Sequence, residues 1–388
     1  MQAVPERFGS YEIYEELGAG GLASVHLARS PAIKSPVALK RLYPHIASNS
    51  QLVGSFIDEA RLARYLQHPG IARIYEYGRL RGTYFIAFEF VPGPTLQQLQ
   101  KHCAAHAVRI PIPIVLEIAY QLCDALDHAH NLRDRVGLPL GIVHRDVSPS
   151  NVIVSSSGQV KLIDFGLAKS KQSSVQSQAG VLKGKLSYVA PEYLVGKLDS
   201  RCDLWALGVC MHELLTGRRL FDAPEQGTIL EQVRAMPITQ PSRMNPEVPR
   251  EVDRIVLKAL ERNPSKRWQN AADIRTALAS CGSRRLTPQQ LVAWVEWAFS
   301  QKQPLREDSA VSALYEILDS RQIEMMGQPS AMTQAMEERR RESVAMTPVT
   351  GAPVVEMVEP VASRRWIWLV FAFVLFAAAA AALILTIR

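Results

Sequence analysis

The chain has 388 residues, a length that suits two domains or one large domain with added segments. Hydrophobic residues make up 47% and charged residues 21%, so most of the chain can build a buried core. The formal net charge of +7 comes from lysines and arginines scattered among acids, and the one dense run, Arg339–Arg341, is flanked by Glu on both sides. Because there is no basic stripe, we expect no nucleic-acid partner.

The cysteines are five, an odd number, and they are widely spaced without a Cys-x-x-Cys pair. This pattern argues against a disulfide framework or a zinc site and indicates a reducing compartment. The first ten residues contain no apolar run that would form a signal peptide. We therefore expect the N-terminal part of the chain to lie in the cytoplasm.

The first ninety or so residues are predicted to form five strands and one helix. Apolar residues at helical spacing predict the helix over Gln51–Leu66. Pro36 directly precedes the third strand, where its missing N–H costs little. The result is a small α+β unit. The five strands are expected at Tyr11–Leu17, Ser24–Ala28, Val37–Arg41, Ile71–Tyr77 and Tyr84–Phe90.

The pattern becomes mostly helical after Gly93. Residues 287–322 carry two further helix-like stretches, and from about Met325 the chain turns polar and then gains prolines, which is typical of a flexible linker. Asp203–Thr216 has few charges, so that helix is expected to be largely buried. The main helices are predicted at Ile114–His130, Asp203–Thr216, Val252–Leu260 and Ala271–Leu278.

Trp366–Ile387 is a run of 22 residues without a charge. At about 1.5 Å rise per residue it would extend roughly 33 Å, enough to cross a bilayer core. A buried core helix is the alternative, but such helices rarely run so long without a charge. Arg364 and Arg365 precede the run, which places its N-terminal side in the cytoplasm. We expect a single-pass C-terminal membrane anchor.

Two motifs in the first part of the chain suit phosphate binding. The loop Leu17–Val25 carries glycines that let backbone N–H groups approach an anion, although a glycine-rich hairpin is often only a turn. A strand follows this loop, whereas a dinucleotide-binding fingerprint requires a helix. Lys40 ends an apolar strand, and Glu59 on the next predicted helix can pair with it beside a nucleotide. The plainer interpretation is a solvated strand end and an exposed helix charge.

A third motif is the run from Val143 to Asn151, followed by apolar residues and then Asp164-Phe165-Gly166. Asp146, Asp164 and the amide of Asn151 can supply one base and a set of metal ligands. In this order, the motifs resemble the protein kinase family, in particular eukaryotic-type serine/threonine kinases similar to the bacterial members. The resemblance covers about 270 residues, from Tyr11 to Leu278.

This resemblance implies a two-lobed α+β fold, with a β-rich N-lobe, a helical C-lobe and ATP between them. It implies transfer of the γ-phosphate of MgATP to Ser/Thr hydroxyls of proteins. Asp146 would accept the hydroxyl proton, while Asn151 and Asp164 would hold Mg²⁺. Phe88 would sit behind the adenine, and Ala23 replaces the third glycine of the usual loop. The residues implied to surround ATP are Leu17, Gly18, Gly20, Gly21, Val25, Ala38, Lys40 (held by Glu59), Ile153 and the backbone of Glu89 and Val91.

This chain departs from the family pattern at two positions, whose residues meet beside the catalytic Asp in the family. Serine/threonine kinases usually have Lys two residues after the catalytic Asp, where this chain has Ser148. They also usually have Thr in the Gly-Thr-x-x-Tyr segment, where this chain has Lys185. Our hypothesis is that the two residues have exchanged roles, with Lys185 supplying the positive charge near the γ-phosphate and Ser148 a hydroxyl that orients it. The alternative is a solvent-exposed Lys185 and a less effective site.

The resemblance also implies how the segment after Asp164 is held and regulated. Arg267 would pair with Glu192 of Ala190-Pro191-Glu192, and Asp203 would anchor the catalytic loop. Autophosphorylation is expected in Ser173–Ser177, and a homodimer is one way to carry it out in trans, although a plain polar loop is the alternative. Other serines in the same segment are Ser170 and Ser187.

The sequence therefore predicts a kinase domain over 11–280, a helical extension over 281–324, a juxtamembrane linker over 325–363 and a transmembrane helix over 366–387. The rival from another class is a pseudokinase scaffold that binds nucleotide or partners at the membrane without turnover. A small-molecule kinase is a weaker rival, because the Ala-Pro-Glu segment is typical of protein kinases.

Overall fold

The computed structural model describes residues 5–165, 185–196, 198–282 and 285–301. All of these residues belong to one structural unit. Its first part is a six-stranded antiparallel sheet in the order β1-β2-β3-β4-β6-β5. The strands are β1 (Glu6–Phe8), β2 (Tyr11–Ala19), β3 (Ala23–Ser30), β4 (Ile33–Leu42), β5 (Ile74–Leu80) and β6 (Thr83–Glu89).

The sheet has one more strand than the sequence predicts, because β1 is only three residues long and too short to show an alternating pattern. The third predicted strand was expected to begin after Pro36, but β4 includes this proline. The register against β3 shifts between Ala28 and Ser30, and pairing with β6 begins only at Val37. A proline at such an irregularity interrupts no ladder bond with β6, so the strand tolerates it.

Helix α1 (Ser50–Ala63) begins at Asn49, whose side chain accepts hydrogen bonds from the backbone N–H groups of residues 51 and 52. It ends three residues before the predicted end, because the N–H of Leu66 bonds back to Ala63 in a tightened turn. Strand β5 starts at Ile74 and not at Ile71, since residues 71 and 72 pair with Leu162 instead.

The second part is helical and contains one small hairpin, β7 (Val152–Val154) with β8 (Val160–Leu162). Helix α2 was not expected, because only three of its residues are buried and its apolar pattern is correspondingly weak. The helices are α2 (Leu96–Ala105), α3 (Ile112–His130), α5 (Arg201–Thr216), α6 (Gln226–Ala235), α7 (Pro241–Met244), α8 (Arg250–Ala259), α9 (Ala271–Ala279) and α10 (Pro288–Ser300), with short 3-10 turns η1 (Pro149–Asn151) and η3 (Pro191–Val195).

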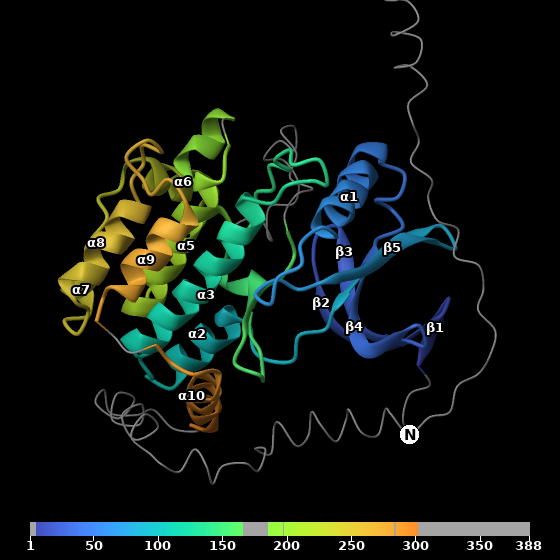
Figure 1. The fold of residues 1–388 in the computed structure, drawn as a ribbon, viewed down its shortest axis with the longest axis horizontal. Helices are drawn as coiled ribbons and strands as arrows, with labels where there is room; N and C mark the ends of the chain where they lie inside the picture. The colour runs from blue at the N-terminus through green and yellow to red at the C-terminus, as the bar shows by residue number, and fades with distance from the viewer. Residues whose placement is uncertain (1–4, 166–184, 197, 283–284, 302–388) are drawn as a thin grey trace, which may run out of the picture. The chain divides into compact units, whose positions relative to one another are not determined.

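Helix α5 is the centre of this part and is buried on all sides from Cys202 to Leu215, as its low charge predicts. It packs against α3 and α8, and α9 lies along α3 (Figure 1). Gly208 allows the approach to α8, because a Cβ there would lie 2.9 Å from the Cβ of Ala259. This rigid helical core supports the loops that carry the polar motifs.

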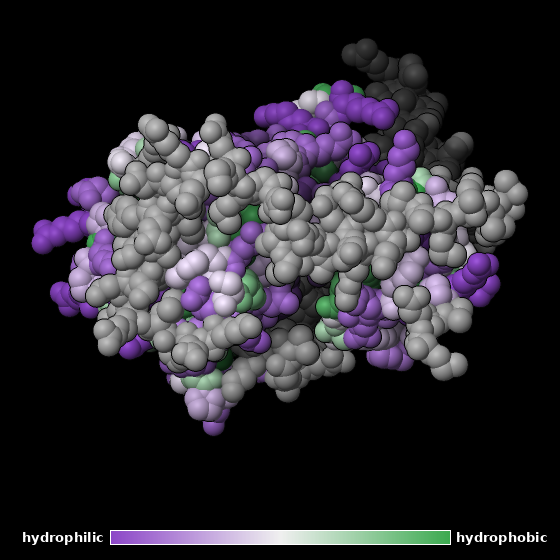
Figure 2. All heavy atoms as spheres, turned by 90° about the horizontal axis from the view of Figure 1, so that it is seen from below, coloured by the Kyte–Doolittle hydropathy of each residue, from purple (hydrophilic) through white to green (hydrophobic). Residues whose placement is uncertain are grey.

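Helix α10 corresponds to the first of the two helix-like stretches predicted in 287–322. The second stretch, the linker 325–363 and the predicted membrane segment 366–387 lie outside the described residues. Within the described ranges, no helix is both long enough and apolar enough to cross a bilayer. The described surface in Figure 2 is mostly hydrophilic, with hydrophobic side chains confined to small patches.

Candidate active site

Lys40 lies in the middle of the sheet, where it is opposite Val25 of β3 and Ile86 of β6. Its Nζ forms an ion pair with Asp164, which follows β8, and lies 3.5 Å from Oε1 of Glu59 on α1. The side chain of Glu59 is only 5% exposed, whereas that of Asp164 is 37% exposed. The structure thus gathers three charged residues from the sheet, from α1 and from the second part of the chain.

Their pKa values follow from burial and mutual charge. Burial acts to lower the pKa of Lys40, but the charges of Asp164 and then Glu59 outweigh it and raise this pKa above its usual value. Burial acts to raise the pKa of Asp164, but the charge of Lys40 outweighs it and holds this pKa low. Burial raises the pKa of Glu59 to about 7, against the opposing effect of Lys40. The ammonium and the Asp164 carboxylate are therefore both charged at neutral pH.

Asp146 lies on the loop before η1, with Asn151 at the end of η1. The Nδ2 of Asn151 donates to the backbone oxygen of Asp146 at 2.8 Å and to its Oδ2 at 2.9 Å. Lys185, from the segment that precedes Ala190, places its Nζ 2.5 Å from the same Oδ2. The carboxylate of Asp146 is thus held between an amide and a lysine. Ser148 is buried, and its Oγ shares a hydrogen bond of 3.0 Å with Ser150.

Asp203 at the start of α5 anchors this loop. Its Oδ2 accepts from the backbone N–H of His144 and from Nε2 of His130, both at 2.8 Å, and its Oδ1 accepts from the N–H of Arg145 at 2.8 Å. Burial acts to raise the pKa of Asp203, but the hydrogen bond from His130 and the nearby charge lower it. Asp203 is therefore an ionised carboxylate that fixes two consecutive backbone amides.

His144 connects the loop that carries Asp146 to the segment that carries Asp164. The backbone N–H of Asp146 donates to His144 Nδ1 at 3.2 Å, and His144 Nε2 donates to the oxygen of Ile163 at 3.3 Å. Its ring lies 4.4 Å from that of Phe165. Burial lowers the pKa of His144, so the ring is neutral and can accept at one nitrogen and donate at the other.

Arg145 and Asp164 both have a left-handed backbone, with φ of 62° and 60°. Non-glycine residues adopt this conformation rarely, and it persists where surrounding contacts hold it. The N–H of Arg145 is held by Asp203, and the carboxylate of Asp164 by Lys40. Asp164 thus belongs to the cluster of polar side chains, and Arg145 directly precedes Asp146.

The glycine-rich loop joins β2 and β3. Gly18 is opposite Val25, and the N–H of Gly20 donates to the oxygen of Ala23 at 2.8 Å. A Cβ added to Gly18 would meet no atom within 4 Å, so packing within the protein does not require glycine there. Open space beside the backbone suits a ligand that approaches the loop. Leu17 is half-exposed on the same strand.

The segment after β6 connects the two parts of the chain. Glu89 is opposite Val37, and its N–H donates to the oxygen of Arg73 at 2.7 Å. Its carboxylate pairs with Lys161 of β8 at 2.9 Å, a contact that no sequence motif indicates. Ala38 is opposite Phe88 across the sheet, and Lys40 Nζ lies 6.0 Å from the Phe88 ring centre. Val91 is buried after this strand, and Ile153 lies on β7.

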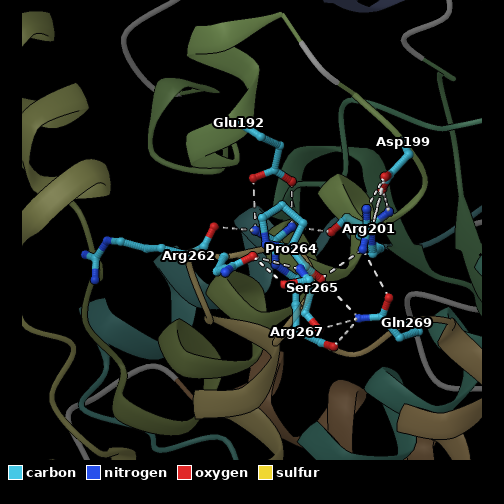
Figure 3. Close-up of polar contacts among 9 residues, drawn as sticks. Glu192, Asp199, Arg201, Arg262, Pro264, Ser265, Arg267 and Gln269 are labelled. Atoms are coloured by element: carbon cyan, nitrogen blue, oxygen red, sulfur yellow. Dashed lines mark hydrogen bonds and ion pairs between the residues drawn. The ribbon is translucent and has the colours of Figure 1, made fainter.

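The end of the segment before α5 is fixed by a buried ion pair. Arg267 donates to both oxygens of Glu192, at 2.6 and 2.9 Å, and to the backbone oxygen of Arg201 at 2.7 Å (Figure 3). The side chain of Arg267 is fully buried. Its guanidinium lies 5.3 Å from the Trp205 ring centre. This pair is the one expected from the Ala-Pro-Glu motif.

Two observations near this segment differ from what the sequence predicts. Ser187 is 1% exposed, so it is not available for phosphorylation in this conformation. Tyr188 donates to Glu213 on α5 at 2.7 Å, and this contact is buried. The one sequence signal for it is an acid, Glu213, in a helix that is otherwise expected to be buried. Ser170 and Ser173–Ser177 lie outside the described residues, as does Gly166.

In the described part of the chain, no three His, Cys, Asp or Glu residues converge to hold a metal ion by themselves. Asn151 and Asp164 supply two oxygen-bearing side chains, which fits Mg²⁺ bound through one or two protein ligands plus phosphate and water. The Asn151 amide points its Nδ2 at Asp146, which turns its carbonyl oxygen the other way. The donor set therefore suits a magnesium–nucleotide complex better than a site that binds metal alone.

Comparisons with known proteins agree with this arrangement. The model of the protein kinase domain matches residues 11–279. The tyrosine-protein kinase MasK of Myxococcus xanthus is 36% identical over 284 residues, which cover 72% of this chain and 44% of MasK. The serine/threonine-protein kinase PrkC of Bacillus subtilis is 34% identical over 274 residues, which cover 69% of this chain and 40% of PrkC. The matched region is less than half the length of these relatives.

The crystal structure of the Mycobacterium tuberculosis PknI kinase domain is similar, with a TM-score of 0.55 and 26% identity. The similarity covers 71% of this chain and 98% of that domain. It confirms the predicted two-lobed fold, with a β-rich first part and a helical second part. With the family model matching well over half of its length, this chain belongs to the protein kinase family, in the type represented by the bacterial serine/threonine kinases.

Proposed function

We propose that this chain is a membrane-anchored protein kinase that transfers the γ-phosphate of MgATP to Ser/Thr hydroxyls of proteins and phosphorylates itself. The observation that carries the proposal is two groups of contacting side chains, Lys40 with Asp164 and Glu59, and Asp146 with Asn151 and Lys185. The groups are near each other, because the charges of Lys185 and Asp146 act on Asp164. A scaffold that has lost turnover would not need these four side chains together. Phosphoryl transfer depends on positioning and charge neutralisation, which this set can supply.

In this proposal Asn151 and Asp164 hold Mg²⁺, which supplies charge neutralisation at the phosphates when bound. Lys40 turns from Asp164 to the α- and β-phosphates and is kept in place by Glu59. The glycines of the β2–β3 loop lie over the phosphates, and Asp146 accepts the proton of the substrate hydroxyl. The adenine lies between Val25, Ala38 and Ile153. Its edge meets the backbone of Glu89 and Val91.

Lys185 is proposed to replace the lysine that is missing from the catalytic loop. Its Nζ already lies 2.5 Å from Asp146 Oδ2, so the positive charge is beside the reacting hydroxyl. Ser148, buried two residues after Asp146, brings no positive charge to this position and shares a hydrogen bond with Ser150, so the charge must come from another segment. Lysine acts here as a point charge, so arginine should preserve part of its effect.

Transfer of labelled phosphate by the full chain tests the activity, with Asp146→Asn as the inactive control. Lys185→Met should lower turnover by about a hundredfold to a thousandfold, the range for removing one group that stabilises charge in a transition state, and Lys185→Arg by clearly less. Equal, near-full turnover of both variants would refute the exchange. Binding of nucleotide without any labelled product in the wild type would identify a pseudokinase instead.

The acceptor class and regulation need separate assays. Ser/Thr acceptors are supported by relatives named serine/threonine kinases, while MasK is named a tyrosine kinase. Phosphoamino-acid analysis of the labelled product decides between them, and phosphotyrosine alone would contradict the proposal. Intact-mass measurement of active protein should show phosphate, which peptide mapping should place in Ser173–Ser177.

Membrane attachment is proposed from the uncharged run 366–387 in the sequence. The full chain should sediment with membranes and resist extraction by alkaline carbonate. A chain that ends at residue 363 should stay in the supernatant. Full release of both forms by carbonate would refute the anchor while leaving the kinase activity untouched.

A further inference from the structure

Helix α10 lies beyond residue 279, where the match to the family model ends, yet it is integrated into the helical core. Its N-terminus is closed by a capping box between Thr287 and Gln290, and one face of the helix is buried. The buried side chains are Leu291, Trp294, Val295 and Ala298. Contacts from α10, and from Arg285 three residues before its start, lead to two sides of the candidate nucleotide site.

The first contact reaches the segment Phe90–Thr95 that joins β6 to α2, called the hinge below. Gly158, in the turn between β7 and β8, has a φ of +78°, and a Cβ there would lie 2.2 Å from the backbone oxygen of Pro288. On its other side the same hairpin holds the hinge, because Ser156 N–H donates to Pro92 at 2.8 Å and Val154 N–H donates to Pro94 at 3.0 Å. The turn is therefore packed between the start of α10 and the hinge.

The second contact joins the C-terminal end of α10 to α2. His102 of α2 donates from Nε2 to the oxygen of Ala298 at 2.9 Å, and its ring stacks on Phe299 at 4.5 Å. Helix α2 begins at Leu96, directly after the hinge. Both ends of α10 thus contact elements that are continuous with the hinge or bonded to it.

A third path runs from Arg285 to β8. Arg285 donates to both oxygens of the buried Glu117 on α3, at 2.5 and 2.8 Å, and lies over the ring of Tyr120. Glu117 accepts a hydrogen bond from Gln121 at 2.9 Å, and Gln121 accepts one from the N–H of Val160 at 2.9 Å. Strand β8 then leads in two residues to Asp164, the proposed Mg²⁺ ligand.

We propose that α10 and Arg285 are positioning elements of the nucleotide site, which hold the hinge from one side and β8 from the other. They touch neither substrate nor nucleotide and act through Gly158, α2 and Glu117. The proposal rests on the proposed function in that the site binds MgATP. It assigns to residues outside the family match a role in affinity for nucleotide, so changes in α10 should alter nucleotide binding more than the phosphoryl-transfer step.

Gly158→Ala in the full chain tests the hinge contact. The added Cβ must displace either α10 or the turn, so affinity for a non-hydrolysable ATP analogue with Mg²⁺ should fall by about fivefold or more, the lower end of coupling between sites. Gly82→Ala is the matched control, because Gly82 sits in the β5–β6 turn with a φ of +83° and open space around its Cβ position. Equal affinities of the two variants would overturn the proposal.

Arg285→Gln tests the third path, from Arg285 to β8, without changing the turn at Gly158, and Arg285→Lys is the conservative variant. Steady-state kinetics should show a raised KM for ATP with kcat within about twofold of the wild type, and the lysine variant should recover part of the KM, because uniform binding and not transition-state contact is lost. A loss of kcat alone would overturn the proposal. Failure of the wild-type chain to bind the analogue would overturn the proposed function as well.

Discussion

Replacing Arg267 by methionine should destabilise the kinase domain strongly, because it leaves a carboxylate buried without its cation. Arg267 is fully buried, Glu192 is 9% exposed, and two hydrogen bonds join them. Removing one partner of such a pair costs about 3–5 kcal/mol, and the loss of the bonds to the backbone oxygens of Arg201 and Glu261 favours the upper part of this range. At about 2 °C per kcal/mol for a domain of this size, Tm should fall by about 6–10 °C.

Thermal and urea unfolding of the full chain measure this effect. The double variant Arg267→Met with Glu192→Leu should recover at least about half of the loss, because it removes the unpaired charge together with its partner. A single variant within about 1 kcal/mol of the wild type would refute the reasoning, as would a double variant no more stable than the single one. Either result would mean that water or another group already compensates the Glu192 carboxylate.

Three further predictions concern the elements that hold the site. Asn49→Ala removes the cap of α1 and should cost about 1 kcal/mol in urea unfolding, whereas no change would contradict the capping role. In Asp203→Asn the new Nδ2 cannot accept the hydrogen bond that a carboxylate oxygen accepts, so the loop that carries Asp146 should shift. We expect kcat to fall about a hundredfold, and an unaltered kcat would contradict the anchoring role of Asp203. Burial raises the pKa of Glu59 to about 7 from 4.5, so its ionisation, and its pairing with Lys40, should increase as pH rises through about 7. KM for ATP should then fall with rising pH in the wild type but not in Glu59→Gln, and equal profiles would contradict the pairing. Because this pKa is raised, the contribution of Glu59 to stability is largest below about 4.5 and is lost as pH rises through about 7.

Much of the fold was predictable because the spacing of apolar residues along the chain indicates which faces are buried. The charge-poor run of α5 and the apolar spacing of α1 indicated a central helix and an amphipathic one, and both are present. The errors fall where local pattern is weak. Strand β1 is too short to alternate, only three residues of α2 are buried, and the beginning of β5 depends on hydrogen bonds of Gly70 and Ala72 with Leu162.

In the candidate site too, local contacts could be predicted from the sequence and long-range contacts could not. Asp146 and Asn151 are five residues apart on one loop, so their meeting follows from spacing, and the order of motifs was enough to name the family. The contacts of Lys40 with Asp164 and of Lys185 with Asp146 join residues 124 and 39 positions apart. No periodicity specifies such pairs, because they depend on how the sheet, the catalytic loop and the helices pack.

Sequence alone therefore determined which chemical groups are present and in what order, since residue type and local spacing need no knowledge of packing. Tertiary structure decided which groups meet, including the position of Lys185 beside Asp146, the pairing of Glu89 with Lys161 and the contact of α10 with the turn at Gly158. The physical reason is that burial and charge partners come from elements distant in the chain. The sequence identifies a lysine as positively charged, but only the fold determines which carboxylate lies beside it.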